Sequence, residues 1–227
     1  MKKIAAYAVH LFTALGAALG LWSIILIYNG SYQETLWILA AAAVIDSLDG
    51  ALARKAQTKV HAAQIDGGLM DNIVDFITWT VAPLFWLYAT MQLPIWVLLA
   101  CATASIFGFS NTAAKTDDHF FTGFPSYWNI VAVYLYLLNL PTIFASAILL
   151  LFAVTVFMPV RFVYPTRTLH LRGLTLVLGA LFVLHFLALI YFFDQSPPLL
   201  IYSSFLFPVY YFGLSFYLNI KLPETID

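Results

Sequence analysis

Charged residues and cysteine are scarce in this sequence. Only 9% of its 227 residues are charged, whereas 63% are hydrophobic, and the mean hydropathy is +0.90. This composition excludes a soluble globular domain and is typical of a protein with several membrane-spanning helices. Cys101 is the single cysteine, so an intrachain disulfide is excluded, and its place in an apolar run predicts a small packing residue.

Polar linkers, low-complexity tracts and internal repeats are also absent from the sequence. We therefore expect one integral-membrane domain over residues 1–227. Apolar runs of roughly the 20 residues needed for one crossing predict an all-α, polytopic bundle with about eight transmembrane helices. The first run is too long for a signal peptide, so we expect it to be retained. The runs cover residues 5–28, 33–54, 67–90, 94–113, 126–140, 142–163, 172–193 and 198–220.

Basic residues are distributed unevenly along the chain. All ten lie near a terminus, or in or at the edges of the three longer connections between the runs, and the four short turns contain none. The positive-inside rule then predicts that both termini are cytoplasmic. The pattern also supports the short fifth run, because without it the later basic residues would change sides. The ten are Lys2, Lys3, Arg54, Lys55, Lys59, Lys115, Arg161, Arg167, Arg172 and Lys221.

Four aspartates interrupt the second and third apolar runs. Asp46 and Asp49 are three residues apart, and Asp71 and Asp75 are four apart, so each pair lies on one face of its helix. A charge deep in a membrane helix costs ~2.5 to 3.5 kcal/mol, so a cation is expected to meet these carboxylates. Carboxylate oxygens suit Mg2+ or Mn2+, and no Cys or His pair at zinc spacing accompanies them.

Two glycines and an arginine accompany the aspartates. Gly50 follows Asp49 directly, and Gly67 precedes Asp71 by four positions, so a bulky ligand could approach the backbone at both places. Arg54, one turn beyond Gly50, could pair with a phosphate. Together these features predict a pyrophosphate substrate, although glycines also serve helix packing in membranes and intramembrane acids also belong to ion pathways.

The order of these residues resembles the signature of the CDP-alcohol phosphotransferase family. That signature reads Asp-x-x-Asp-Gly-x-x-Ala-Arg, a spacer, and Gly-x-x-x-Asp-x-x-x-Asp. The spacer here has twelve residues, where the usual family form has about eight, and this longer spacer looks like the branch of bacterial phosphatidylcholine synthases. Segments near residues 8–16 and 115–129 are similar to that branch too. The signature positions are Asp46, Asp49, Gly50, Ala53, Arg54, Gly67, Asp71 and Asp75.

The resemblance implies an enzyme that transfers the phosphatidyl group of CDP-diacylglycerol to choline, giving phosphatidylcholine and CMP. It implies two Mn2+ or Mg2+ ions, and Asp75 as the general base on the choline hydroxyl. The implied metal ligands are Asp46, Asp49, Asp71 and Asp75. The positions implied to bind CDP-diacylglycerol are Thr13, Gly50, Ala53, Arg54 and Gly67.

The resemblance also carries expectations about partners and location. It implies a homodimer, surrounded by membrane lipid, in the bacterial inner membrane. The chain would cross that membrane several times, with the active site toward the cytoplasm. No nucleic-acid partner is expected.

The connection from residue 115 to residue 129 combines acids with aromatic residues. A quaternary ammonium offers no hydrogen-bond donor, so a protein holds it by aromatic faces and nearby negative charge. The candidate choline contacts in this connection are Asp117, Asp118, Tyr127 and Trp128. Tyr127 and Trp128 could instead belong to an interfacial aromatic belt.

Two other segments carry polar candidates. Arg161, Arg167 and Arg172 lie in one connection, and they could anchor lipid phosphates or bind the phosphates of the liponucleotide. Asp66 directly precedes Gly67, where a helix N-cap is expected more than a metal ligand.

Two other functions remain open on the sequence. The first is the same transfer to another acceptor: serine, inositol, glycerol phosphate or ethanolamine. A phosphorylated acceptor would favour arginines near the aspartates over aromatic residues. A cation transporter using the four aspartates is the second. A transporter would need polar residues that continue toward the other membrane face, and Thr78 and Thr80 are the main candidates there.

Overall fold

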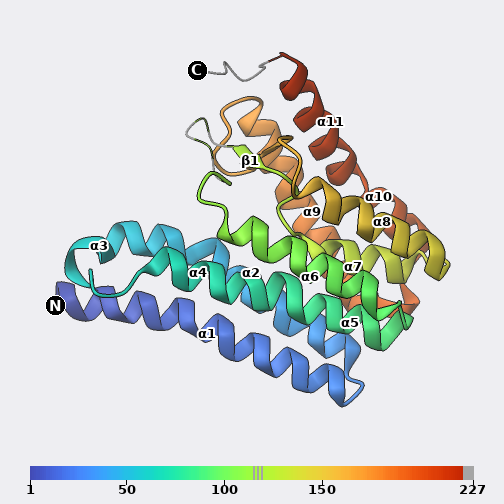
Figure 1. Ribbon diagram of the computed structural model, residues 1–227, viewed down its shortest axis with the longest axis horizontal. Coiled ribbons are helices and arrows are strands. Elements are labelled where there is room, and N and C mark those ends of the chain that lie inside the picture. Colours follow the sequence, from blue (N-terminus) through green and yellow to red (C-terminus); the bar gives the residue numbers. More distant parts are fainter. Residues whose placement is uncertain (115, 117, 119, 222–227) are drawn as a thin grey trace.

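The first two apolar runs form the two longest helices of the described residues. The computed structural model describes residues 1–114, 116, 118 and 120–221. Helices α1 (Lys2–Tyr28) and α2 (Tyr32–Ala56) run antiparallel and pack against each other along their length (Figure 1). Gly30 makes the tight turn between them with φ of +77°, a conformation that glycine adopts without strain.

The third run is a continuous helical rod in three parts. A single helical turn, α3 (Thr58–His61), leads from α2 toward α4 (Gly67–Asp75). Asp66 caps α4, because its Oδ1 accepts the backbone N–H groups of Gly68 and Leu69 at 3.0 Å each, as the sequence predicted. The rod then widens into a π-helix, η1, and continues as α5. These last two parts are Phe76–Val81 and Ala82–Met91.

The remaining apolar runs are helical as well. Three are short helices: α6 (Ile95–Ser110), α7 (Trp128–Leu137) and α8 (Thr142–Thr155). A long helix, α9, ends in a short 3-10 turn, η2, and is followed by α10 and α11. These last four elements are Arg172–Phe192, Phe193–Gln195, Pro198–Ser204 and Leu206–Lys221.

Among the residues that the structure describes, five helical segments are long and apolar enough to cross a membrane. They are Lys2–Tyr28, Tyr32–Ala56, Gly67–Met91, Arg172–Gln195 and Pro198–Lys221. The apolar helices α6, α7 and α8 are shorter. The chain is therefore mostly helical and fits a multi-pass membrane protein, as its composition predicted.

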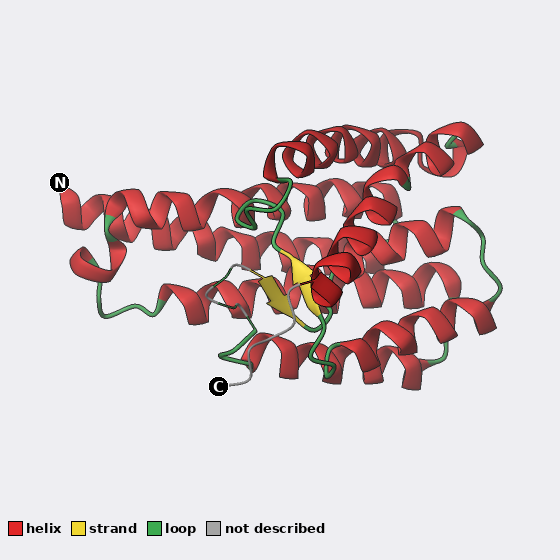
Figure 2. Cartoon of the chain, turned by 90° about the horizontal axis from the view of Figure 1, so that it is seen from above, coloured by secondary structure: helices red, strands yellow, loops and turns green. Residues whose placement is uncertain are grey.

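A small β-ribbon, which the sequence did not predict, covers the helices. Strands β1 (Phe120–Thr122) and β2 (Arg161–Val163) pair antiparallel, and the two views show them lying together over the bundle (Figures 1 and 2). Helix α11 holds β2, because Asn219 Oδ1 accepts the N–H of Arg161 at 2.9 Å and Asn219 Nδ2 donates to the Arg161 carbonyl at 2.6 Å. Ser215 Oγ accepts the N–H of Val163 at 3.1 Å. The C-terminal helix thus fixes the ribbon.

Two glycines of α1 bring this helix close to α4 and η1. A Cβ added at Gly16 would lie 2.5 Å from Cγ1 of Val74, and one added at Gly20 would lie 2.6 Å from Cγ2 of Ile77. Such close approach of backbones is the usual use of glycine between membrane helices. These contacts position α4 and η1 behind the site described below.

We expect Gly16→Ala to lower the melting temperature of the purified protein. The added methyl would collide with the buried Val74 side chain, and overpacking of this kind costs about 1 to 3 kcal/mol. Gly213→Ala is the matched control, because nothing lies within 4 Å of its added Cβ, so helix propensity alone should leave it neutral or slightly stabilised. Thermal unfolding in detergent measures both, and a Gly16→Ala variant as stable as Gly213→Ala would contradict the packing argument.

Candidate active site

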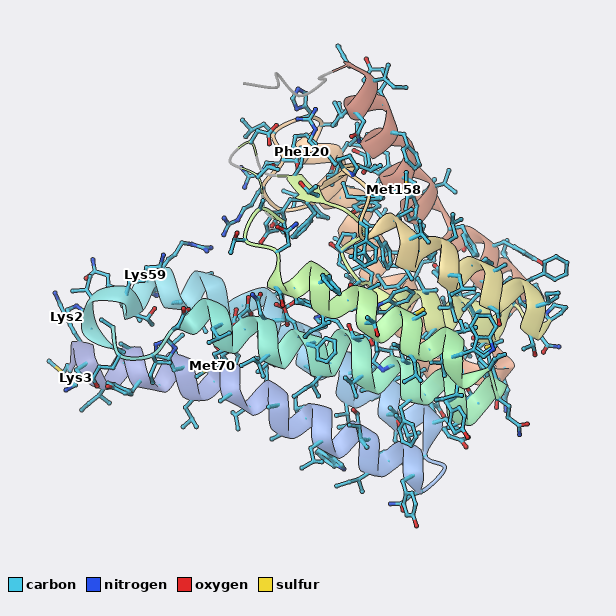
Figure 3. The ribbon with its side chains drawn as sticks, in the orientation of Figure 1. Lys2, Lys3, Lys59, Met70, Phe120 and Met158 are labelled. Carbon is cyan, nitrogen blue, oxygen red and sulfur yellow. The ribbon has the colours of Figure 1, made fainter. Side chains whose placement is uncertain are left out.

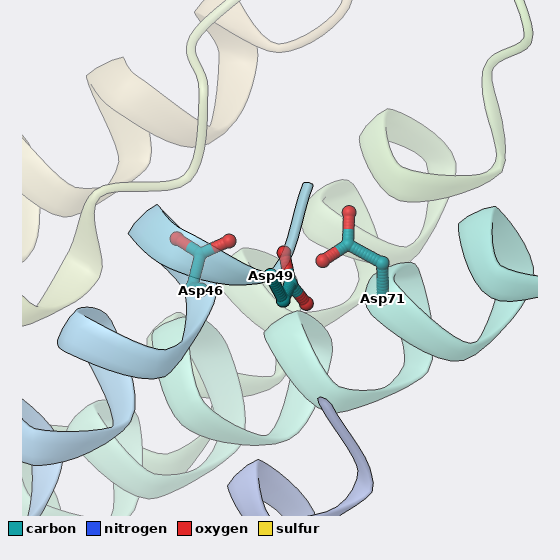
Figure 4. Close-up of side chains that lie close together, drawn as sticks. All are labelled: Asp46, Asp49 and Asp71. Carbon is teal, nitrogen blue, oxygen red and sulfur yellow. The ribbon is translucent and has the colours of Figure 1, made fainter. Parts of the chain in front are cut away.

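Three of the four predicted carboxylates converge between α2 and α4. One oxygen from each of Asp46, Asp49 and Asp71 lies within 4.8 Å of the others (Figure 4). Asp49 is buried, and the other two are partly buried. The three-residue spacing on α2 places Asp46 and Asp49 on one side of that helix, where Asp71 of α4 faces them.

The donor set of these three side chains fits a divalent metal ion. Carboxylate oxygens are the ligands that Mg2+ and Mn2+ prefer, and partial burial limits competition from bulk water. Asp75 follows Asp71 by one helical turn and lines the same cavity, although it is outside the group of three. The described carboxylates therefore form a candidate metal centre with a fourth acid beside it.

A cavity of about 590 Å³ extends from the aspartates to the ribbon. Four parts of the chain contribute to its wall: α2, the rod of α4 and η1, the end of α6 with the connection to α7, and the connection from α8 to α9. This volume is within the range usual for small-molecule sites. The residues that matter below are Asp46, Asp49, Gly50, Arg54, Gly68, Asp71, Asp75, Trp79, Phe121, Tyr127, Tyr164 and Arg167.

The predicted liponucleotide contacts divide into two groups. Gly50 and Arg54 line the cavity. Thr13, Ala53 and Gly67 are not among the described residues of its wall. Thr13 is buried in α1 and donates its hydroxyl to the Val9 carbonyl at 3.3 Å, while a Cβ at Gly67 would lie 3.0 Å from Cε1 of His10.

The predicted choline contacts also separate. Tyr127 lines the cavity, whereas Trp128 has no exposed surface and donates its indole N–H to Ser105 Oγ at 2.7 Å. Asp118 pairs instead with Arg161 Nη1 at 3.0 Å, and Asp117 lies outside the described residues. Tyr127 is thus the one of these candidates that the described structure brings to the aspartates.

Two aromatic rings lie beside the ring of Tyr127. Its centroid is 5.9 Å from that of Trp79 and 6.3 Å from that of Tyr211. Tyr127 and Trp79 both line the cavity that the aspartates line, so they contribute aromatic surface to its wall.

The three arginines of the connection after α8 have different surroundings. Arg161 is buried and lies 5.2 Å from the ring centroid of Phe120, so its contacts are those of a structural residue. Arg167 lines the cavity and lies over the ring of Tyr164 at 5.2 Å. Arg172 is the first residue of α9. This connection therefore supplies Arg167 to the cavity wall.

Trp79 and Tyr164 are cavity residues that the sequence analysis missed. Trp79 is four residues after Asp75, so the helical period of that segment could have identified it. Tyr164 stacks on Phe121 with ring centroids 4.5 Å apart, across the ribbon. No local pattern signals Tyr164, because it follows β2 directly and reaches the cavity through the pairing of β1 with β2. Arg167 was a candidate phosphate contact on the sequence, and it lies in the cavity wall.

Comparison with known proteins assigns a family to the part of the chain that carries the aspartates. A family model described as CDP-alcohol phosphatidyltransferase matches residues 7–160. That region contains the aspartate cluster, Arg54, Trp79 and Tyr127, whereas β2 and all that follows it lie beyond the match.

Several relatives match over most of the chain. A phosphatidylcholine synthase of Legionella pneumophila is 41% identical over 171 residues, which are 73% of this chain and 67% of the relative. One of Borreliella burgdorferi is 34% identical, covering 84% of this chain and 83% of the relative. One of Rhizobium meliloti is 30% identical, covering 96% and 92%. With a family model across more than half of its length and relatives of this extent, the chain belongs to the CDP-alcohol phosphatidyltransferase family.

Proposed function

We propose that this chain transfers the phosphatidyl group of CDP-diacylglycerol to choline, giving phosphatidylcholine and CMP. The observation that carries the proposal is one cavity that joins a cluster of aspartates to a wall of aromatic side chains. Aspartates suit a divalent ion on a pyrophosphate, and aromatic faces suit a quaternary ammonium. Relatives named phosphatidylcholine synthase, one of which aligns with 96% of the chain, support the same reaction.

Asp46, Asp49 and Asp71 are the proposed ligands of a Mg2+ or Mn2+ ion, and Asp75 completes a set that could hold two. When bound, such ions neutralise the charge that develops on the pyrophosphate and on the departing CMP. Arg54 pairs with a phosphate of the liponucleotide, and Gly50 leaves the backbone of α2 open beside it. Thr13, Ala53 and Gly67 lie off the described wall, so their proposed contribution is to the packing of the helices beside the liponucleotide.

Asp75 is the proposed general base. Its carboxylate takes the proton of the choline hydroxyl while the hydroxyl oxygen forms a bond to the phosphorus of the phosphatidyl group. The bond between that phosphorus and the oxygen of CMP breaks in the same displacement. Such transfers depend on positioning more than on elaborate acid–base groups, which suits a site with so few polar residues.

Tyr127 is the proposed choline contact of the connection before α7. Trp128 anchors that connection by its hydrogen bond to Ser105 of α6. Asp118 forms an ion pair with Arg161 of β2 and so stabilises the ribbon. Asp117, which lies outside the described residues, remains a proposed source of negative charge near the acceptor. The acyl chains of CDP-diacylglycerol remain in the bilayer and reach the cavity between helices.

We also propose that all eight apolar helical segments cross the membrane as one domain over residues 1–227. Both termini and the active site would then lie on the cytoplasmic side of the inner membrane, and the protein would be a homodimer, as its resemblance to the family implies. Lys2, Lys3 and Lys59 lie at the same end of the bundle (Figure 3), which supports this orientation.

Purified protein is expected to release CMP from CDP-diacylglycerol with choline and not with serine, inositol, glycerol phosphate or ethanolamine. The assay follows CMP and labelled lipid with Mn2+ or Mg2+ present. Activity with another acceptor would be consistent with the proposed metal centre and would contradict choline as the acceptor. Failure to release CMP with any acceptor would contradict the proposed reaction.

Asp71→Asn is expected to reduce CMP release at least about 100-fold, because a ligand of the charge-neutralising ion is lost. It should also abolish the rise in melting temperature that Mn2+ gives the wild-type protein through binding to the folded state. Asp194→Asn is the matched control, since Asp194 lies in η2 and its Oδ1 accepts the Tyr136 hydroxyl at 2.6 Å, a bond that asparagine can keep. An Asp71→Asn variant that still responds to Mn2+ would remove Asp71 from the metal centre.

Cysteine labelling tests the orientation. In a Cys101→Ala background, Asn29→Cys in the turn between α1 and α2 is expected to react with a membrane-impermeant maleimide added to intact cells. Lys59→Cys in α3 should react only after the membrane is permeabilised. The reverse pattern would place the active site on the outer side.

A further inference from the structure

The helix that carries Asp75 changes its winding immediately after this residue. Residues Phe76–Val81 form a π-helix, η1, between two α-helical parts of one continuous rod. Widened turns of this type are uncommon and are frequent at functional sites, because they alter the direction of the side chains that follow. Trp79 belongs to this turn, and its side chain lines the cavity.

The ring of Trp79 meets the ring of Tyr127 at an angle. Their centroids are 5.9 Å apart and their planes are inclined by 60°, so the two rings form adjoining walls rather than a closed stack. Trp79 is half-buried, which leaves part of its surface accessible from the cavity. Two aromatic residues from distant parts of the sequence therefore meet at one place in the cavity.

The connection that carries Tyr127 is held rigidly. Ser126 has a left-handed backbone with φ of +57°, and its hydroxyl donates to Ser105 Oγ at 3.1 Å. The same oxygen accepts the indole N–H of Trp128 at 2.7 Å. Because Ser105 is fully buried on α6, this network fixes the backbone on both sides of Tyr127.

The chemistry of choline restricts where its ammonium can be bound. A two-carbon arm joins the ammonium to the hydroxyl that reacts, so the group that recognises the ammonium must lie close to the general base. Trp79 is one helical turn from Asp75. Phe120 and Trp128 are 2% and 0% exposed, so neither offers a free ring face to the cavity.

We propose that Trp79 is a specificity-determining residue that, with Tyr127, holds the trimethylammonium group of the acceptor. This inference rests on the proposed transfer to choline. The two ring faces attract a cation and contact its methyl groups, and the carboxylates of Asp46 and Asp75 add negative charge to the same cavity. A primary ammonium would lose its hydrogen bonds to water against these two aromatic rings. The pair of Trp79 and Tyr127 therefore disfavours ethanolamine and serine as acceptors.

Steady-state kinetics of Trp79→Leu test this role. The KM for choline is expected to rise roughly 10- to 30-fold, the effect of losing one cation–π contact that is shielded from water, while the KM for CDP-diacylglycerol stays within about threefold. Trp79→Phe keeps a smaller ring and should fall between Trp79→Leu and the wild-type protein. Trp96→Leu is the matched control, because Trp96 is 60% exposed at the start of α6 and its kinetics should not change.

A series of acceptors gives a second readout that a merely structural role would not produce. The wild-type protein is expected to prefer choline to dimethylethanolamine and both to ethanolamine. Trp79→Leu should compress this order, because the methyl groups lose the ring face that distinguishes them.

The outcomes separate this inference from the proposed function. A wild-type protein that is inactive with choline overturns the reaction itself. An active wild-type protein whose Trp79→Leu variant keeps the choline KM and the order of acceptors overturns the role of Trp79 alone. If Trp79→Leu does not fold, judged by loss of the Mn2+-dependent rise in melting temperature, Trp79→Phe decides through the same acceptor series.

Discussion

The gathering of carboxylates inside an apolar bundle is the constraint on which the rest of the structure depends. Three aspartate oxygens lie within 4.8 Å of one another, and like charges at this separation repel strongly unless a cation meets them. The helices that carry them must therefore be held together by other contacts. Close packing of α1 supplies part of this support. Gly16 and Gly20 contact α4 and η1, and no described residue of α1 lines the cavity.

The site has two halves of different origin. The helices α2 and α4 carry the acids and lie within the region that matches the family model. Tyr164 and Arg167 reach the same cavity from the segment beyond that match, and β2 in that segment is held by Asn219 and Ser215 of α11. Helix α11 thus supports the ribbon beside the cavity, and it contributes no residue to the aspartate cluster. The carboxylates thus lie on the helices, whereas Tyr164 and Arg167 belong to a segment that a separate set of hydrogen bonds anchors.

Aromatic residues in this chain serve two purposes that only burial distinguishes. Trp128 and Tyr127 are neighbours in sequence, yet Trp128 is fully buried against Ser105 while Tyr127 lines the cavity. Adjacent residues at the start of a helix point in different directions, so one can anchor the connection and the other can face a ligand. In a chain with 17% aromatic residues, composition alone could not make this assignment.

The sequence by itself determined the helical, multi-pass architecture, the N-cap at Asp66 and the placement of Asp46 and Asp49 on one face of α2, because these depend on hydropathy, capping chemistry and helical period. It also predicted that four aspartates of two helices converge, and the structure groups three of them, Asp46, Asp49 and Asp71. The helical period also places Trp79 one turn beyond Asp75, so the sequence could have identified it. Only the tertiary structure decided that Tyr164 joins the cavity, that Arg167 is the one of the three candidate arginines in its described wall, and that Asp118 pairs with Arg161. Those contacts depend on the pairing of two connections about forty residues apart, and no local pattern records which strand a short extended segment will meet.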